Sequence, residues 1–226
     1  MTRLLSTRRS VLAGAACLLP TLSARAEPSP AIAAIEGSIG GRVGVAAFDT
    51  GSGKRIEHRA NERFSMCSTF KLLASAAVLH RVDRGKEQLD RRVRYSQSEL
   101  LAYAPICEQH VQAGMTVGEL CAAAVEYSDN TAANLLLASL GGPTGFTHFA
   151  RSLGDNVTRL DRNEPALNTA IPGDPRDTTS PSAMLADMRA VLLGTMLTPP
   201  SRKTLQDWLI ANTTGAAKIR AGVPAT

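Results

Sequence analysis

The serine and lysine of the segment Ser68-Thr69-Phe70-Lys71 could together perform nucleophilic chemistry. Residues three apart lie on one face of a helix, so the Lys71 amine can reach the Ser68 hydroxyl. A serine is a weak nucleophile until a base takes its proton, and a partly desolvated lysine can be that base. A helix N-terminus also offers N–H groups to a developing oxyanion. A helix-capping serine beside a solvated lysine is the alternative interpretation of this segment. However, burying a lysine at the start of an apolar helix costs free energy, which favours a functional role.

A second polar segment, Ser128-Asp129-Asn130, lies between two predicted helices. Its residue types are those that favour a turn followed by a helix N-cap. Taken alone, the segment therefore predicts a structural turn. It gains a possible chemical meaning only in combination with the serine and lysine above.

The third candidate lies in a long polar loop at residues 155–179. Glu164 and Asn168 are four residues apart, so a carboxylate and an amide could together hold one water molecule. Arg162 and Asp177 carry opposite charges near the two ends of the loop and could clamp its neck. A solvated acidic loop is the alternative interpretation, although loops of this length are usually functional or disordered.

The elements that must position these residues indicate an α+β protein. Residues 42–50 and 55–59 predict a β-hairpin, and residues 68–82 are apolar on nearly every face, which is typical of a central helix. Because a lone hairpin is marginal in water, more strands are expected beside it. Further helices are predicted at 116–124, 130–140, 143–154, 180–194 and 200–212.

Composition narrows the class of protein. The chain has 226 residues, 44% of them hydrophobic, which is enough for one domain or two small ones and too apolar for a disordered chain. Its formal charge is +5, but residues 1–26 hold four arginines and no acidic residue. The remainder has 21 basic and 20 acidic residues, so no nucleic-acid partner is predicted.

The N-terminus has the pattern of an export signal. Arg8-Arg9 precede an apolar stretch at 11–19, and Ala24-Arg25-Ala26 forms an A-x-A cleavage site. The stretch is shorter than the ~20 residues that span a bilayer, so no stable membrane insertion is expected. A twin-arginine signal and an ordinary secretory signal both fit. We therefore predict a cleavable signal at 1–26 and a periplasmic or secreted protein.

Cysteine and histidine usage disfavours a metal centre. Cys67, Cys107 and Cys121 follow the predicted signal, and an odd count leaves at least one thiol without a partner within the chain. The histidines are scattered, and neither H-E-x-x-H nor C-x-x-C occurs. We predict no metal and no cofactor.

Together and in this order, the S-x-x-K, S-D-N and Glu-Pro-x-Leu-Asn segments resemble the class A β-lactamase family over the whole chain that follows the signal. The resemblance implies a β-lactamase/transpeptidase-like fold, in which a helical subdomain packs on an antiparallel sheet layer. Residues 27–59 would begin the α/β subdomain, and 60–210 would form the helical subdomain with the active site and an Ω-type loop at 155–179. Residues 211–226 would begin the C-terminal α/β part.

The resemblance also implies catalytic roles. Ser68 would attack the lactam carbonyl, and Lys71 would accept its proton, directly or through Glu164 and a water molecule. Ser128 would relay a proton to the departing ring nitrogen. Glu164 would deprotonate the water that hydrolyses the acyl-enzyme, and its bond to Pro165 is expected to be cis.

Substrate-binding roles follow in the same way. Asn130 would bind the amide side chain of a small β-lactam substrate, and Asn168 would help to position the water. Tyr103 matches the aromatic residue at the rim of such sites, although an ordinary surface tyrosine fits equally. Lys218 and Arg220 lie near the carboxylate-binding region, and neither is singled out as the anchor. A monomer is expected.

The chain departs from the family at its third motif. Lys-Thr-Gly is absent, and the sequence ends at Thr226, before the strand that would carry it. We therefore expect an incomplete sheet and a fragment that is inactive or unstable, since losing one oxyanion donor costs ~10²–10³ in turnover. Two other functions remain open. One is a penicillin-binding D-alanyl-D-alanine carboxypeptidase, which lacks the Glu-bearing loop, and the other is an exported non-catalytic relic.

Overall fold

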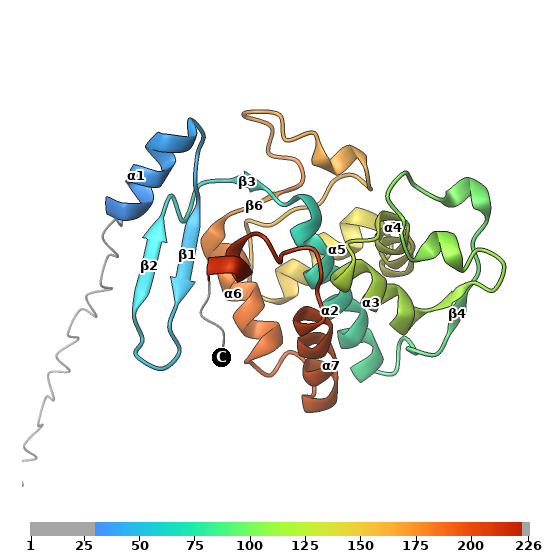
Figure 1. Cartoon of the computed structure of the whole chain (residues 1–226). Helices are drawn as coiled ribbons and strands as arrows, with labels where there is room; N and C mark the ends of the chain where they lie inside the picture. Colours follow the sequence, from blue (N-terminus) through green and yellow to red (C-terminus); the bar gives the residue numbers. More distant parts are fainter. Residues whose placement is uncertain (1–29, 223–226) are drawn as a thin grey trace, which may run out of the picture.

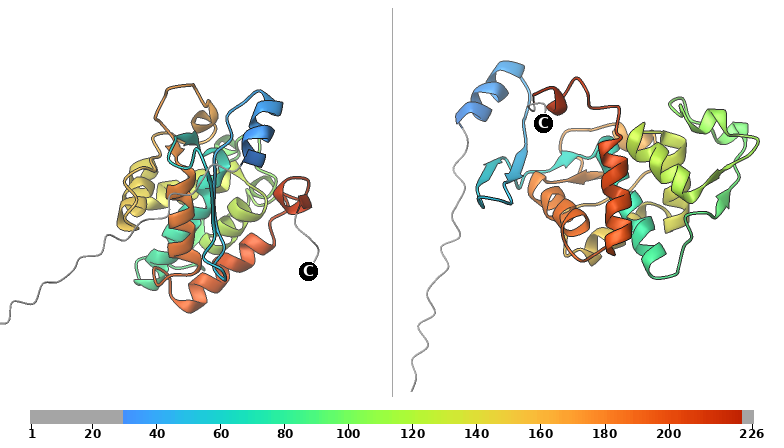
Figure 2. Two further views of the ribbon diagram at one scale, coloured as in Figure 1. Left: turned by 90° about the vertical axis from the view of Figure 1, so that its left-hand side faces the viewer. Right: turned by 60° about the horizontal axis from the view of Figure 1, so that its bottom comes forward.

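The computed structural model describes residues 30–222, and the predicted signal at 1–26 lies outside them. Helices form most of the molecule, while an N-terminal helix and a β-hairpin stand together at one side (Figures 1 and 2). The helices are α1 (Pro30–Ile39), α2 (Phe70–Asp83), α3 (Val117–Glu126), α4 (Asn130–Leu140), α5 (Gly142–Ser152), α6 (Pro181–Leu192) and α7 (Pro199–Ile210). The strands are β1 (Val45–Phe48), β2 (Arg55–His58), β3 (Phe64–Ser65), β4 (Arg92–Val93), β5 (Met115–Thr116) and β6 (Thr178–Thr179).

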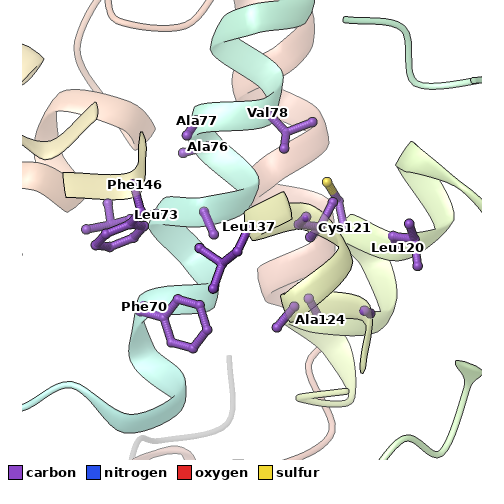
Figure 3. Packing of buried hydrophobic residues seen from close by; sticks show 14 of the residues in the cluster. Phe70, Leu73, Ala76, Ala77, Val78, Leu120, Cys121, Ala124, Leu137 and Phe146 are labelled. Atoms are coloured by element: carbon purple, nitrogen blue, oxygen red, sulfur yellow. The ribbon is translucent and has the colours of Figure 1, made fainter. Parts of the chain in front are cut away.

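Helix α2 is the centre of the core, as its apolar sequence predicts. Its side chains are buried on nearly every face, and α3, α4, α5, α6 and α7 all pack against it. Phe70 meets the ring of Phe146 edge-on at 6.0 Å, and Leu73 and Leu137 fill the space beside them (Figure 3). A helix enclosed in this way holds its first turn in a fixed place.

The strands pair only two by two within residues 30–222. β1 and β2 form the predicted antiparallel hairpin, with Val45 opposite His58 and Phe48 opposite Arg55. The pairs β3–β6 and β4–β5 were not predicted, because strands of two residues carry no readable alternation. No strand of the described chain adds to the hairpin. The mixed helix and sheet content with few strands agrees with the predicted α+β class and its incomplete sheet.

Polar contacts attach α1 to the hairpin, since α1 has no buried residue. Glu36 accepts hydrogen bonds from Arg59 Nε at 2.7 Å and from Val43 N at 2.8 Å, and it lies 3.0 Å from His58 Nε2. The hydrogen bonds from Arg59 are the main reason why the pKa of Glu36 falls to about 2. Among residues 30–222, no helix has both the length and the apolar character to cross a membrane.

Candidate active site

Ser68 lies in a short 3₁₀ turn (η1, Cys67–Thr69) that leads directly into α2. The residue before it, Cys67, has φ +44°, a conformation that is uncommon for residues other than glycine. Thr69 Oγ1 donates to Met66 O at 2.7 Å and closes the turn. Ser68 itself is exposed, so its hydroxyl is accessible from solvent.

Lys71 is 2% exposed and is surrounded by oxygen atoms. Its Nζ donates to Ser128 O (2.7 Å), Ser128 Oγ (3.1 Å) and Asn130 Oδ1 (2.6 Å), and it lies 3.3 Å from Glu164 Oε1. Burial lowers the pKa of Lys71, and the Glu164 carboxylate opposes this shift. Within the described chain no hydrogen bond joins Lys71 to Ser68, although their spacing predicts that the two side chains can meet.

Asp129 holds the turn that carries Ser128 and Asn130. Its Oδ1 accepts from Ala132 N at 2.8 Å and so caps α4, while Oδ2 accepts from the N–H groups of residues 106 and 107 at 3.0 and 2.9 Å. Ser128 has φ +60°, in the left-handed region, and both its O and its Oγ accept from Lys71 Nζ. Asn130 N donates to Tyr103 O at 3.0 Å, so the two candidate binding residues lie on neighbouring segments.

Glu164 is 4% exposed and is held from both sides. Asn134 on α4 donates to Glu164 O at 3.0 Å and accepts from Glu164 N at 2.9 Å, while Asn168 Nδ2 donates to Glu164 Oε2 at 2.5 Å. The bond to Pro165 is cis, as expected. The 3.3 Å contact with Lys71 lacks the alignment of a hydrogen bond, so Oε1 is buried without a donor among the described residues.

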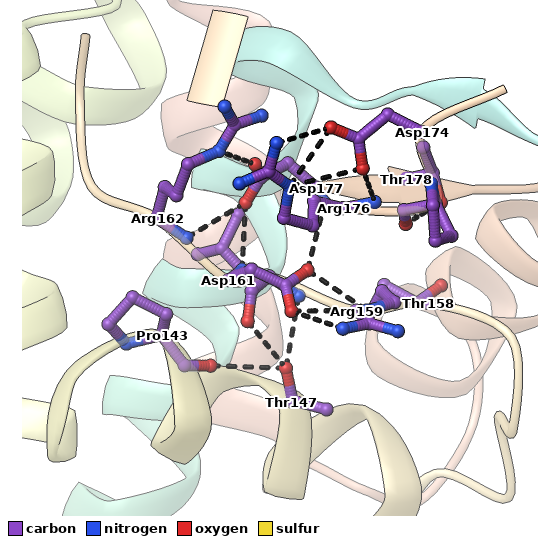
Figure 4. Close-up of polar contacts among 12 residues, drawn as sticks. Pro143, Thr147, Thr158, Arg159, Asp161, Arg162, Asp174, Arg176, Asp177 and Thr178 are labelled. Carbon is purple, nitrogen blue, oxygen red and sulfur yellow. Dashed lines mark hydrogen bonds and ion pairs between the residues drawn. The ribbon is translucent and has the colours of Figure 1, made fainter. Parts of the chain in front are cut away.

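The neck of the Ω-type loop is closed by a buried ion pair (Figure 4). Arg162 Nε donates to Asp177 Oδ2 at 2.6 Å, and Asp177 Oδ1 accepts from the backbone N–H groups of Asp161 and Arg162 at 2.7 and 2.9 Å. The Asp177 side chain is fully buried, and that of Arg162 is largely so. A second pair in the same loop, Arg176–Asp174, lies near the surface.

Ser68, Lys71, Tyr103 and Ser128 line one cleft of about 730 Å³. The cleft lining does not include Asn130, Glu164 and Asn168. Asn130 and Glu164 contact Lys71 instead, and Asn168 contacts Glu164. Tyr103 is 52% exposed.

The chain after α7 adds one cation to this cleft. Thr213 N donates to Glu126 O at 2.9 Å, which attaches the segment to the end of α3. Lys218 then lines the cleft, whereas Arg220 Nη1 donates to Asn212 O at 3.0 Å. Of the two basic residues left open by the sequence, Lys218 is the one that faces the cleft.

Two supporting residues were not singled out from the sequence. Asp129 was visible only as part of a turn, and Asn134 has no motif around it, because both act on backbone groups distant in sequence. Within residues 30–222 no group of three or more His, Cys, Asp or Glu side chains could hold a metal, and Cys67, Cys107 and Cys121 are unpaired.

Comparisons with known proteins agree on one family. The model of the β-lactamase enzyme family matches residues 27–226. The β-lactamase AST-1 of Nocardia asteroides is 55% identical over 205 residues, covering 91% of this chain and 66% of its own length. Toho-1 of Escherichia coli is 52% identical over 225 residues, covering 97% and 77%. The chain thus spans about two thirds to three quarters of the length of these relatives.

Solved structures of class A β-lactamases are also similar to this chain. An ancestral Gram-negative class A β-lactamase has a TM-score of 0.85 and 60% identity, over 86% of this chain and 75% of that one. A putative class A β-lactamase, PenP from Rhodopseudomonas palustris, has a TM-score of 0.83 and 61% identity, over 85% and 74%. The chain belongs to the β-lactamase enzyme family, among the class A serine β-lactamases.

Proposed function

We propose that the protein hydrolyses the ring amide of β-lactam antibiotics through an acyl-enzyme on Ser68. The observation that carries this proposal is the environment of Glu164. One carboxylate oxygen accepts from Asn168, and the other is buried 3.3 Å from the Lys71 ammonium with no hydrogen-bond donor among the described residues. A buried carboxylate oxygen of this kind can accept a proton from water.

In the first half-reaction, Ser68 Oγ attacks the lactam carbonyl. Lys71 donates to three oxygen acceptors, so in this arrangement it is an ammonium and has no lone pair with which to accept a proton. The Ser68 proton therefore passes to Glu164 through a water molecule, or Lys71 first gives up a proton to Glu164 and then acts as the base. Burial, which lowers the pKa of Lys71, favours the second route.

Ser128 completes the ring opening. Its Oγ accepts from Lys71 Nζ at 3.1 Å, so the hydroxyl proton is free to be donated to the departing ring nitrogen. A proton then passes from Lys71 to Ser128. This step links the base of the attack to the acid of the leaving group within one hydrogen-bonded chain.

After ring opening, Lys71 is neutral and takes back the proton that Glu164 gained, across their 3.3 Å contact. In the second half-reaction, the Glu164 carboxylate takes a proton from the water that attacks the acyl ester of Ser68, and it gives this proton to Ser68 Oγ as the ester bond breaks. Asn168 holds the carboxylate through Oε2, which leaves Oε1 as the oxygen that accepts this proton. Positioned general bases contribute typically 10²–10⁴-fold to a rate. This base separates hydrolysis from simple trapping, since a penicillin-binding carboxypeptidase lacks the Glu-bearing loop.

The test is Glu164→Ala in the full protein. We expect the variant to react once with a penicillin and to keep the acyl group, so that intact-mass spectrometry shows a stable covalent adduct. Glu108→Ala, which removes an exposed carboxylate on another segment, should turn over normally. Normal turnover by Glu164→Ala, with no adduct, would overturn the assignment.

Class A β-lactamases are generally exported, and we infer a cleavable signal at residues 1–26 that delivers a monomer to the periplasm or the medium. The arginine pair, apolar stretch and A-x-A site support this inference, and the family match begins at residue 27. N-terminal sequencing of the exported protein should begin at Glu27. A mature protein that retains Arg8 would contradict it.

A further inference from the structure

Two buried aspartates meet at the base of the Ω-type loop, away from the catalytic cleft. Asp155 opens the loop after α5, and Asp187 lies on α6, which begins directly after the loop ends. Asp187 is 1% exposed, and neither of its oxygens accepts a hydrogen bond within the described chain. Both aspartates line a cavity of about 410 Å³ that the catalytic residues do not share.

Asp155 already uses its oxygens. Oδ1 accepts from Val157 N at 2.6 Å and from Thr158 N at 3.0 Å, which fixes the first turn of the loop. Thr158 Oγ1 lies 2.6 Å from Thr179 Oγ1, so the two ends of the loop touch at this turn. Asp155 is thus arranged as an acceptor, that is, as the ionised member of a pair.

Asp187 and Asp155 line the same cavity, and each carboxyl group acts on the pKa of the other. Two carboxylates cannot hydrogen-bond unless one of them carries a proton. Burial, and then the negative Asp155, raise the pKa of Asp187 to about 8. For Asp155, hydrogen bonds from Thr158 and Val157 outweigh burial, and its pKa is lowered.

The charges around the pair leave the proton in place. Arg151 on α5 is the other charged group that acts on Asp187. Its Nη1 donates to two backbone carbonyls, Asp155 O at 2.5 Å and Thr158 O at 2.8 Å, rather than to either carboxyl group. The elements β1, α2 and α7, which also pack on α6, contribute no charge acting on Asp187 among the described residues.

We propose that Asp155 and Asp187 share one proton, and that this carboxylic acid–carboxylate hydrogen bond joins the start of the Ω-type loop to α6 and makes the stability of the fold depend on pH. The unfolded chain ionises Asp187 near its ordinary value of 3.8, whereas the folded chain holds the proton up to about pH 8. Unfolding between these values releases a proton. Stability therefore falls as pH rises through this window and levels off above it.

The experiment compares the wild type with Asp187→Asn by urea unfolding from about pH 5 to pH 9. An asparagine keeps the shape and a donor but has no proton to lose. The ratio of unfolding equilibrium constants, wild type over variant, should rise about tenfold per pH unit up to pH ~8 and then stay constant. The exposed Asp207→Asn on α7 is the matched control and should follow the wild type.

A second measurement needs no variant. Infrared spectra of the wild type near neutral pH should show the carbonyl band of a buried neutral carboxylic acid, which disappears with a midpoint near pH 8. Parallel stability curves for wild type and Asp187→Asn, or no such band, would refute the shared proton. So would a rise in the melting temperature of the wild type, but not of Asp187→Asn, in millimolar calcium chloride, because the pair would then hold a cation instead.

Discussion

Removing the Arg162 guanidinium, which closes the neck of the Ω-type loop, should destabilise the loop without destabilising the helical core. In Arg162→Ala, the fully buried Asp177 carboxylate keeps only its two backbone donors, at 2.7 and 2.9 Å. Breaking a buried ion pair on one side costs about 3–5 kcal/mol. The two remaining charge-assisted hydrogen bonds compensate part of this, so we expect a loss of about 3 kcal/mol. Because the packing of α2 against the other helices does not involve the pair, the loss should appear as local opening of residues 159–178 and of the turn at Met66 that Asp177 anchors.

Two assays check this expectation. Hydrogen exchange should show faster exchange of loop amides at about 100-fold or more, with the amides of α2 unchanged. Pre-steady-state kinetics should show an accumulating acyl-enzyme, because Glu164 leaves its position on Asn134. Arg176→Ala removes the exposed pair in the same loop and should change neither measurement. Equal effects of the two arginine substitutions would refute the reasoning, because burial of the Arg162–Asp177 pair would then add nothing to the stability of the loop.

Two further outcomes are expected. Lys218→Ala should raise the KM of carboxylate-bearing β-lactams about tenfold with little change in kcat, because the cation binds substrate without entering the chemistry. Lys218→Arg should restore the KM. An unchanged KM in Lys218→Ala would exclude Lys218 as the anchor of the substrate carboxylate. Glu36 contributes to the docking of α1 fully above pH 4.5, and the contribution is lost as pH falls toward 2, because its folded pKa is depressed. Exchange of α1 amides should accelerate over that range in the wild type but not in Glu36→Gln, and identical profiles would contradict it.

The sequence predicted those parts of the site that depend on local spacing. A single apolar segment, 68–82, was enough to place α2 at the centre, and with it the position of Ser68. Each polar motif identified the candidate residues within its own segment. Their mutual contacts could not be read from spacing, because Lys71 binds oxygen atoms of residues 128 and 130, some 57 to 59 positions away.

The elements and residues that the sequence did not predict also depend on contacts between distant segments. Helix α1 contains two of the weaker helix formers, Pro30 and Gly37, and buries no residue, so it has no apolar stripe to reveal it. Strands β3 to β6 are two residues long and form only through tertiary pairing. Asn134 and Asp129 act through backbone groups on other segments, for which a single sequence carries no signal.

One backbone hydrogen bond connects the turn that carries Ser68 to the Ω-type loop. Met66 N, two residues before Ser68, donates to Asp177 O at 2.9 Å, and β3 and β6 pair beside it. The turn that presents Ser68 and the loop that presents Glu164 are therefore anchored to each other, not only to the core. Any inhibitor or substitution that displaces the loop must also disturb the turn. The two proposed half-reactions therefore depend on the same backbone contact, and a substitution that moves it should affect both.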